Sequence, residues 1–337
     1  MIKAQYKKHI LFFKQPSGTS RGVLTEKETY ILTIENNHKK GIGECNFFKG
    51  LSIDNEDLYE KKLQWTCENI NLGKDILWQE LLDFPSIQFG IEQAFINLEN
   101  EDEIYFPSRF TEEKEGIIIN GLIWMGNIDF MWKQIAEKFS QYFNCIKLKI
   151  GVNIKEELAL LEELRTSFSE KELEIRVDAN GAFSYQKALE VLPELAKLNI
   201  HSIEQPIKPK QIDEMRKLCE KSQIPIALDE ELIGILQPKH KQKLLENIKP
   251  QYIILKPALI GGFKGAEEWI SLAEKMNISW WVTSALESNI GLNALSQWTF
   301  TLKNPMPQGL GTGNLFTNNF TSSLYLEDNE LRFKRNS

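Results

Sequence analysis

The feature that most constrains the fold is a repeat of short apolar strands separated by amphipathic, helix-like stretches. The eight expected strands end at positions 120, 149, 178, 204, 229, 256, 284 and 309, so neighbouring ends lie 25 to 29 residues apart. A βα unit of this length, repeated over eight strands, is typical of a (β/α)8-type barrel. An open, doubly wound sheet is the alternative. It would usually carry a glycine-rich phosphate loop after its first strand, and the sequence has none there.

The first hundred or so residues follow a different pattern, which indicates a separate α+β domain. Alternating apolar residues predict strands at 9–13 and 30–35, small polar residues predict loops at 16–22 and 46–52, and helical spacing predicts a helix at 85–98. We therefore predict an α/β protein with an N-terminal α+β capping domain over residues 1–115 and a barrel over 116–317. The tail, 318–337, can return to the cap as edge strands.

Composition restricts the partners. The net charge of −7 argues against nucleic acid, because phosphate binding requires a basic surface. No apolar run is long enough to span a membrane, and the first residues lack the apolar core of a signal peptide. Four scattered cysteines without a CxxC pair indicate a reduced, cytoplasmic location. The oligomeric state stays open.

Charged residues end five successive expected strands: Lys149, Asp178, Glu204, Asp229 and Lys256. Active sites of such barrels lie at the carboxyl ends of the strands, so we expect these side chains to meet at one mouth. Three adjacent carboxylates repel one another unless a cation lies between them. Because these donors are oxygens with no cysteine or histidine nearby, they favour a hard cation. We predict Mg²⁺, with Mn²⁺ as the alternative, on the aspartates and the glutamate.

Two lysines on the second expected strand, Lys147 and Lys149, lie two residues apart and therefore face the same side, the barrel interior. Each ammonium group disfavours the charge of the other, and a nearby metal ion adds to this effect. Lys149, nearer to the strand end, is the candidate general base, and Lys256 faces it across the mouth. Such a set suits proton abstraction beside the carboxylate of a small-molecule substrate, where a metal stabilises the developing charge.

Five motifs occur in order on successive expected strands: KLK at 147–149, VDAN at 177–180, IEQP at 203–206, LDE at 228–230 and LKP at 255–257. Together they resemble the enolase superfamily, in its muconate-lactonising subgroup, and the resemblance covers nearly the whole chain. It implies a modified TIM barrel, (β/α)7β, with an α+β cap. It also implies Mg²⁺ binding by Asp178, Glu204 and Asp229, and acid/base chemistry by Lys149.

Within this subgroup, SALESNIG (284–291), GLGTG (309–313) and GTSRG (18–22) most resemble the members that dehydrate 2-succinyl-6-hydroxy-2,4-cyclohexadiene-1-carboxylate to o-succinylbenzoate in menaquinone biosynthesis. The resemblance implies that Lys149 removes the α-proton and then protonates the departing hydroxyl on the same face. Lys147 would tune the pKa of Lys149, and a charged Lys256 would stabilise the enediolate intermediate.

The same resemblance implies a set of substrate contacts. The side chains or amides of four residues would hold the succinyl carboxylate: Ser284, Ser288, Gly309 and Gly311. Two cap loops, one with Arg21 and one at 47–51, would close over the substrate and exclude water.

Other functions stay open. A racemase or epimerase of the same superfamily, acting on N-acyl amino acids or dipeptides, needs lysines on both faces of the substrate, and the sequence has both. Dipeptide epimerases resemble one another in an acidic DxD pair on the eighth strand, where this chain reads GLGTG. Racemization of N-succinylamino acids stays open, and cycloisomerisation of muconate is a weaker alternative. A non-catalytic binding protein is a distant alternative, because three uncompensated acids would destabilise an empty mouth.

Overall fold

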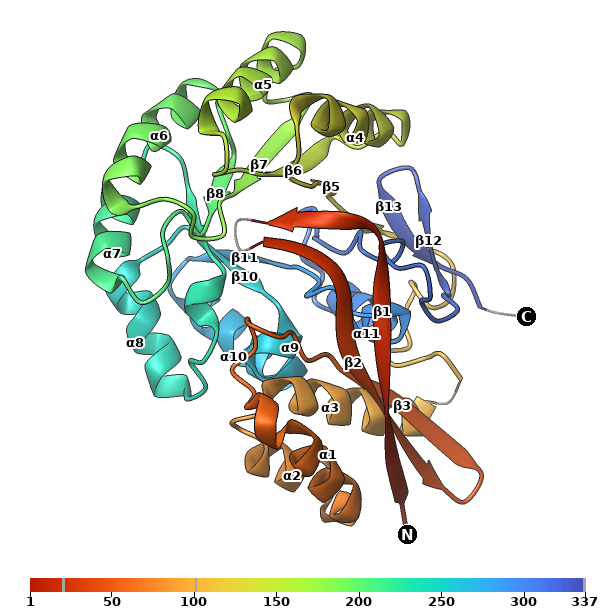
Figure 1. The fold of residues 1–337 in the computed structure, drawn as a ribbon. Helices are drawn as coiled ribbons and strands as arrows, with labels where there is room; N and C mark the ends of the chain where they lie inside the picture. Colours follow the sequence, from red (N-terminus) through yellow and green to blue (C-terminus); the bar gives the residue numbers. More distant parts are fainter. Residues whose placement is uncertain (20–21, 101, 336–337) are drawn as a thin grey trace.

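The structure is a computed structural model that describes residues 1–19, 22–100 and 102–335 (Figure 1). The first sheet is antiparallel, in the order β1 (Lys3–Thr19), β2 (Gly22–Asn36) and β3 (Lys39–Cys45). Helical segments follow it: η1 (Glu56–Leu58), α1 (Tyr59–Glu68), η2 (Ile70–Leu72), α2 (Lys74–Glu80) and α3 (Pro85–Asn100). This part is the α+β cap, and the helix predicted at 85–98 is confirmed as α3.

The cap holds its own core because alternate residues of β2 face the helices. Tyr30, Leu32 and Ile34 are buried against apolar residues of α1, α2 and α3. Helix α3 lies directly on β3. A Cβ atom added to Gly43 would lie 2.0 Å from the carbonyl oxygen of Gly90, so glycine is needed for this close approach.

The second sheet is the parallel barrel sheet. It comprises seven strands in sequence order: β5 (Gly121–Ile123), β6 (Cys145–Lys149), β7 (Glu174–Asp178), β8 (Ser202–Glu204), β9 (Ile226–Leu228), β10 (Tyr252–Leu255) and β11 (Ser279–Val282). The helical segments between and after them are α4 (Ile128–Ser140), α5 (Ile154–Ser167), α6 (Tyr185–Lys197), α7 (Ile212–Lys221), η3 (Glu230–Leu232), α8 (Pro238–Ile248), α9 (Pro257–Ile260), α10 (Gly262–Lys275) and α11 (Asn289–Thr301). Figure 1 shows α4 to α8 around the outside of the strands. The predicted capped (β/α)7β barrel is confirmed.

The predicted eighth strand closes the barrel without forming a regular strand. Gln308 makes an isolated parallel bridge with Ile119, and Gly309 makes one with Thr283. The amide of Gly309 donates to the carbonyl of Val282 at 2.8 Å. The first predicted strand, IIINGL, is split into β4 (Ile117–Ile118) and β5.

The chain end forms a hairpin of β12 (Leu324–Glu327) and β13 (Glu330–Phe333), which pairs with β4 rather than with the cap sheet. The segment just before it contacts β1, where the amide of Thr317 donates to the carbonyl of Phe12 at 2.8 Å. The domain boundary at 115/116 stays a prediction. No helix in the described parts of the chain is long and apolar enough to cross a membrane.

The loop predicted at 16–22 is wrong over most of its length, because β1 continues to Thr19 and β2 begins at Gly22. The register between these strands shifts between Phe12 and Ser17. Pro16 lies in this shift, where a residue without an amide proton breaks no ladder hydrogen bond. The loop at 46–52 is confirmed.

Candidate active site

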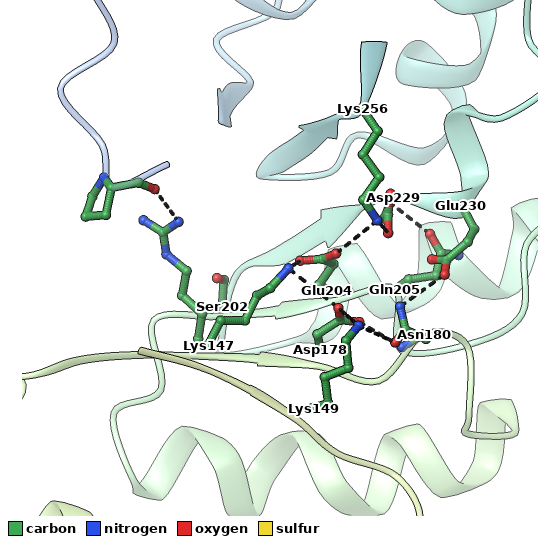
Figure 2. A network of polar contacts seen from close by, with 12 residues as sticks. Lys147, Lys149, Asp178, Asn180, Ser202, Glu204, Gln205, Asp229, Glu230 and Lys256 are labelled. Atoms are coloured by element: carbon green, nitrogen blue, oxygen red, sulfur yellow. Dashed lines mark hydrogen bonds and ion pairs between the residues drawn. The ribbon is translucent and has the colours of Figure 1, made fainter. Parts of the chain in front are cut away.

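The charged residues predicted to end five strands do meet at the carboxyl end of the barrel (Figure 2). Lys147 and Lys149 both lie on β6 and are buried, with 4% and 8% of their surfaces exposed. Residues two apart on a strand face one side, so the pair points into the barrel as the sequence predicts. Register then places Asp178 beside Lys149 and Glu204 beside Asp178.

Each lysine of this group pairs with a carboxylate. Lys149 Nζ donates to Asp178 Oδ2 at 2.8 Å, and Lys147 Nζ donates to Glu204 Oε2 at 2.7 Å. Lys256 Nζ donates to Asp229 Oδ2, and it lies 3.9 Å from Glu204 Oε1. The three acids and three lysines therefore form one continuous buried network.

The three carboxylates fit a hard cation in their chemistry. All are at least 98% buried, and Glu204 Oε1 has no hydrogen-bond partner among the described residues. Oxygen donors without sulfur or imidazole suit Mg²⁺. In the described residues, however, no three histidine, cysteine, aspartate or glutamate side chains converge on one point as metal ligands. Ammonium groups lie against the carboxylates instead.

Burial and neighbouring charge shift the pKa values of these groups in opposite directions. Burial raises the pKa of Asp178, but the charges of Lys149 and Lys147 outweigh it and hold that pKa well below its usual range. Burial lowers the pKa of Lys147, but Glu204 and Asp178 outweigh it and raise the net pKa. A neighbouring ammonium group, that of Lys256, does lower the pKa of Lys147, as expected of lysines that share one site, but Glu204 and Asp178 outweigh this effect.

Asp229 lies close to several charged groups. Burial raises its pKa, Lys256 lowers it, and the negative charges of Glu230 and Glu204 raise it again. The net direction is upward. The pKa of Lys256 is also raised, because Asp229 and Glu204 outweigh its burial. The contact with Asp229 favours the charged form of Lys256, which is the direction that the geometry supports.

Polar side chains next to the network hold its charged groups in place through hydrogen bonds: those of Asn180, Gln205 and Glu230. Asn180 Oδ1 accepts from Lys149 Nζ at 2.6 Å, and its amide nitrogen donates to Glu230 Oε1 at 3.1 Å. Gln205 Oε1 accepts from the amide of Asp229 at 3.1 Å. Lys149 is therefore held between Asp178 and Asn180, which fixes the position of its amino group.

A cavity of about 670 Å³, including its open mouth, lies over this network. One wall is polar and carries Lys147, Lys149, Asp178 and Lys256. The other is apolar and comes partly from the cap: Leu24, Phe48, Leu51, Leu122, Trp124 and Leu286. Such a cavity suits a small carboxylate with an apolar body.

The predicted substrate contacts are only partly brought together. Ser284, Gly309 and Gly311 line the cavity. The hydroxyl of Ser284 is already engaged, since it donates to Glu287 Oε2 at 2.5 Å and accepts from Thr312 Oγ1 at 2.7 Å. Ser288 lies away from the cavity, because its hydroxyl caps α11 and donates to Glu44 at 2.6 Å. Arg21 lies outside the described residues.

Two cavity residues, Thr283 and Asn120, were not predicted. Thr283 is two residues beyond Trp281, whose ring lies in the barrel interior against Ala227, so Thr283 faces inward as well. Thr283 Oγ1 and Asn120 Oδ1 are buried, and neither has a hydrogen-bond partner in the described structure. Gly309 lies between them, and a Cβ atom there would lie 2.6 Å from Thr283 Oγ1. The pair therefore flanks a notch without a side chain.

This notch was missed because Ser284 was taken as the inward-facing residue at the end of the seventh strand, whereas β11 ends at Val282 and the inward-facing residue is Thr283. A shift of one residue selects the opposite face of a strand. Counting inward-facing positions from Trp281 would have selected Thr283.

The comparisons with known proteins agree with the fold. Residues 131–334 match the Enolase C-terminal domain-like family. The chain is 42% identical to the o-succinylbenzoate synthase of Desulfotalea psychrophila, over 97% of each chain. It is similar to the crystal structure of MenC from the same organism, with a TM-score of 0.88, 39% identity, and coverage of 98% and 99% of the two chains.

A more distant structure shares the fold alone. The dipeptide epimerase of Enterococcus faecalis, solved with Mg and the dipeptide L-Leu-L-Tyr, has a TM-score of 0.86 at 17% identity. That alignment covers 99% of this chain and 97% of the epimerase.

Proposed function

The chain belongs to the family of enolase C-terminal domain-like proteins, and on this premise we propose that it is an o-succinylbenzoate synthase. Its reaction would be the dehydration of 2-succinyl-6-hydroxy-2,4-cyclohexadiene-1-carboxylate to o-succinylbenzoate, in menaquinone biosynthesis. The observation that carries the proposal is the near full-length similarity to the o-succinylbenzoate synthase of Desulfotalea psychrophila. The buried lysine and carboxylate network supports the chemistry.

Asp178, Glu204 and Asp229 would hold the metal, Mg²⁺ by preference. Their burial, their adjacent strand ends and the unpartnered Glu204 Oε1 support this assignment. A bound Mg²⁺ supplies a Lewis acid that stabilises negative charge on the substrate carboxylate.

Lys149 would act as the acid/base. As a neutral amine it takes the proton from the carbon beside the carboxylate, and as an ammonium group it returns that proton to the hydroxyl, which leaves as water. Its position between Asp178 and Asn180 supports this role. Lys256 stays charged and stabilises the negative charge that develops. Lys147, bound to Glu204, orients the carboxylate and adds positive charge beside Lys149.

The succinyl arm would reach the notch of Thr283, Gly309 and Asn120. Unpartnered buried polar groups destabilise a protein unless a ligand or water meets them. A ketone or carboxylate oxygen would accept from the Thr283 hydroxyl, whereas Asn120 Oδ1 is an acceptor and would accept from a substrate hydroxyl or a bound water. Gly311 borders the same part of the cavity, and Arg21 remains a proposed contact from the cap loop. Ser284 shapes the wall through its bond to Glu287 rather than binding substrate directly.

The second candidate is racemization of an N-succinylamino acid. Lys149 at the end of β6 and Lys256 directly after β10 favour it, because a racemase needs a base on each face. Incubation in deuterium oxide with Mg²⁺ separates the two. For a racemase, proton NMR shows loss of the α-proton signal of N-succinylamino acids at a rate comparable to turnover. For a dedicated dehydratase, that signal persists while the cyclohexadiene is converted.

A cytoplasmic location would suit this function. The four cysteines, Cys45, Cys67, Cys145 and Cys219, are all free thiols, which is the usual state in a reducing compartment.

A further inference from the structure

A buried lysine of the cap, Lys27 on β2, lies outside the catalytic network. Only 7% of its surface is exposed, and it forms no ion pair with a carboxylate of the described residues. Its Nζ donates to Asn46 Oδ1 and, at 3.4 Å, to the carbonyl of Glu28. Burial lowers the pKa of Lys27 in spite of the charges of Glu44 and Glu287. A buried cation with only neutral acceptors is costly and calls for a reason.

Asn46 connects Lys27 of the cap to the barrel through hydrogen bonds on both sides of its side chain. Its oxygen faces Lys27, and its nitrogen donates to the carbonyl of Ala285 at 3.1 Å and to Glu287 Oε1 at 3.2 Å. The side chain thus meets a donor on one side and acceptors on the other. An amide satisfies both sides, whereas an aspartate or a leucine does not.

Glu287 extends this series of hydrogen bonds to the cavity wall. Oε1 accepts from the amide of Ala285 at 3.1 Å, and Oε2 accepts from Ser284 Oγ at 2.5 Å. Both Ser284 and Ala285 line the cavity, next to Thr283 in the notch. Leu286, at φ 59°, has a left-handed backbone that a leucine adopts only where its surroundings hold it. The hydrogen bonds of Glu287 therefore hold the strained backbone turn at Leu286 in place.

Lys27 also lies beside the cap loop, with Nζ 5.9 Å from the centroid of the Phe48 ring, which lines the cavity from the other side. We propose that Lys27 is a positioning residue for the substrate arm, which acts through Asn46 and Glu287 on the wall formed by Ser284 and Ala285. It couples the docking of the cap to the shape of the cavity. The assignment of the arm rests on the proposed function.

The test compares Lys27→Met with Lys241→Met. Lys241, on α8, is the matched control: it is 1% exposed and donates to the carbonyl of Gly265 and to Glu268, far from the cavity. Methionine keeps the length and removes the charge, and thermal unfolding of both variants checks that they fold. Loss of the Lys27 contact should raise KM about tenfold and change kcat by less than about threefold. Lys241→Met should leave both constants unchanged.

Binding to the Mg²⁺-loaded protein gives a second reading. By calorimetry, Lys27→Met should weaken binding of o-succinylbenzoate about tenfold while leaving benzoate, which lacks the arm, unaffected. Asn46→Asp should reproduce this pattern, because it keeps a partner for Lys27 but turns acceptors toward Ala285 and Glu287. It serves as the second variant if Lys27→Met does not fold.

Hydrogen–deuterium exchange separates this inference from the proposed function. Lys27→Met should exchange faster at 46–52 and 284–288 than the wild type, and Lys241→Met should not, whatever the substrate is. Unchanged exchange there would overturn the proposal, and so would faster exchange with an unchanged KM. A wild-type protein that forms no o-succinylbenzoate would refute the proposed function, while the exchange result would still decide whether Lys27 holds the wall.

Discussion

Lys149 Nζ donates a hydrogen bond to Asp178 Oδ2 over 2.8 Å, so the proposed base and a proposed metal ligand are in direct contact. They come from neighbouring strands, β6 and β7, in register. The acid proposed to bind the metal therefore also holds the amine proposed to take the proton. Substitution of Asp178 should consequently affect both metal binding and chemistry, whereas substitution of Lys149 should affect the chemistry alone.

Replacing Lys149 by alanine should lower kcat by a factor of about 10³ or more, because a positioned general base contributes up to about 10⁴-fold. Binding of Mg²⁺ should persist, since all three carboxylates remain. Turnover by stopped spectrophotometric assay and Mg²⁺ affinity by calorimetry measure the two effects. Substantial dehydration by the variant would remove Lys149 from its role.

Replacing Asp229 by asparagine should weaken Mg²⁺ binding and abolish turnover together, because a charged ligand becomes neutral. Asp213→Asn, at an exposed acid on α7, is the matched control and should change neither property. Mg²⁺ titration of both variants checks this. An unaltered Mg²⁺ affinity in Asp229→Asn would show that the metal is held elsewhere.

Replacing Thr283 by valine removes the unpartnered hydroxyl while nearly keeping the volume. We expect kcat/KM to fall about tenfold, mainly through KM, because one buried hydrogen bond to substrate is lost. The control is Thr299→Val on α11, where the hydroxyl donates to the carbonyl of Leu295 at 2.7 Å and does not line the cavity. Equal kinetics of Thr283→Val and wild type would exclude the notch as the arm site.

Asp54 in the cap predicts a pH dependence of stability. Burial raises its pKa to about 7, although Ser86 donates to Oδ1 at 2.6 Å. A raised folded pKa means that the contribution to stability is complete below the unfolded pKa, near 3.8, and is lost as pH rises through about 7. The slope from this one group is at most about 1.4 kcal/mol per pH unit.

Asp54→Asn should not lose stability as the pH rises through about 7, because asparagine does not ionise. The difference in unfolding free energy between variant and wild type should therefore move in favour of the variant from pH 5 to pH 8. Denaturant unfolding at several pH values measures it, with Asp57→Asn, at an exposed acid, as the control. A difference that stays flat with pH would mean that Asp54 is ionised throughout.

Much of the site could be predicted because the βα repeat fixes its register. A strand end every 25 to 29 residues places Lys149, Asp178 and Glu204 side by side, and the spacing of two places Lys147 with Lys149. Thr283 was missed since Ser284, its neighbour on the opposite face, was chosen as the inward-facing residue.

Other features depend on contacts that no local pattern specifies. The bond from Asn46 to Glu287 joins residues 241 positions apart, and it exists only once the cap has docked on the barrel. The engagement of Ser284 by Glu287 could not be read either, because a serine near a strand end has the same appearance whether its hydroxyl is free or bonded. The long strands β1 and β2 were underestimated since Pro16 and the glycines around it are typical of loops.

The decisive measurement for the proposed function is kcat/KM of the purified protein for 2-succinyl-6-hydroxy-2,4-cyclohexadiene-1-carboxylate, with and without Mg²⁺. We expect conversion to o-succinylbenzoate that requires Mg²⁺, disappears with a chelator, and exceeds the rate with any N-succinylamino acid. Absence of o-succinylbenzoate in the presence of Mg²⁺ would contradict the proposed function, although membership of the family would stand.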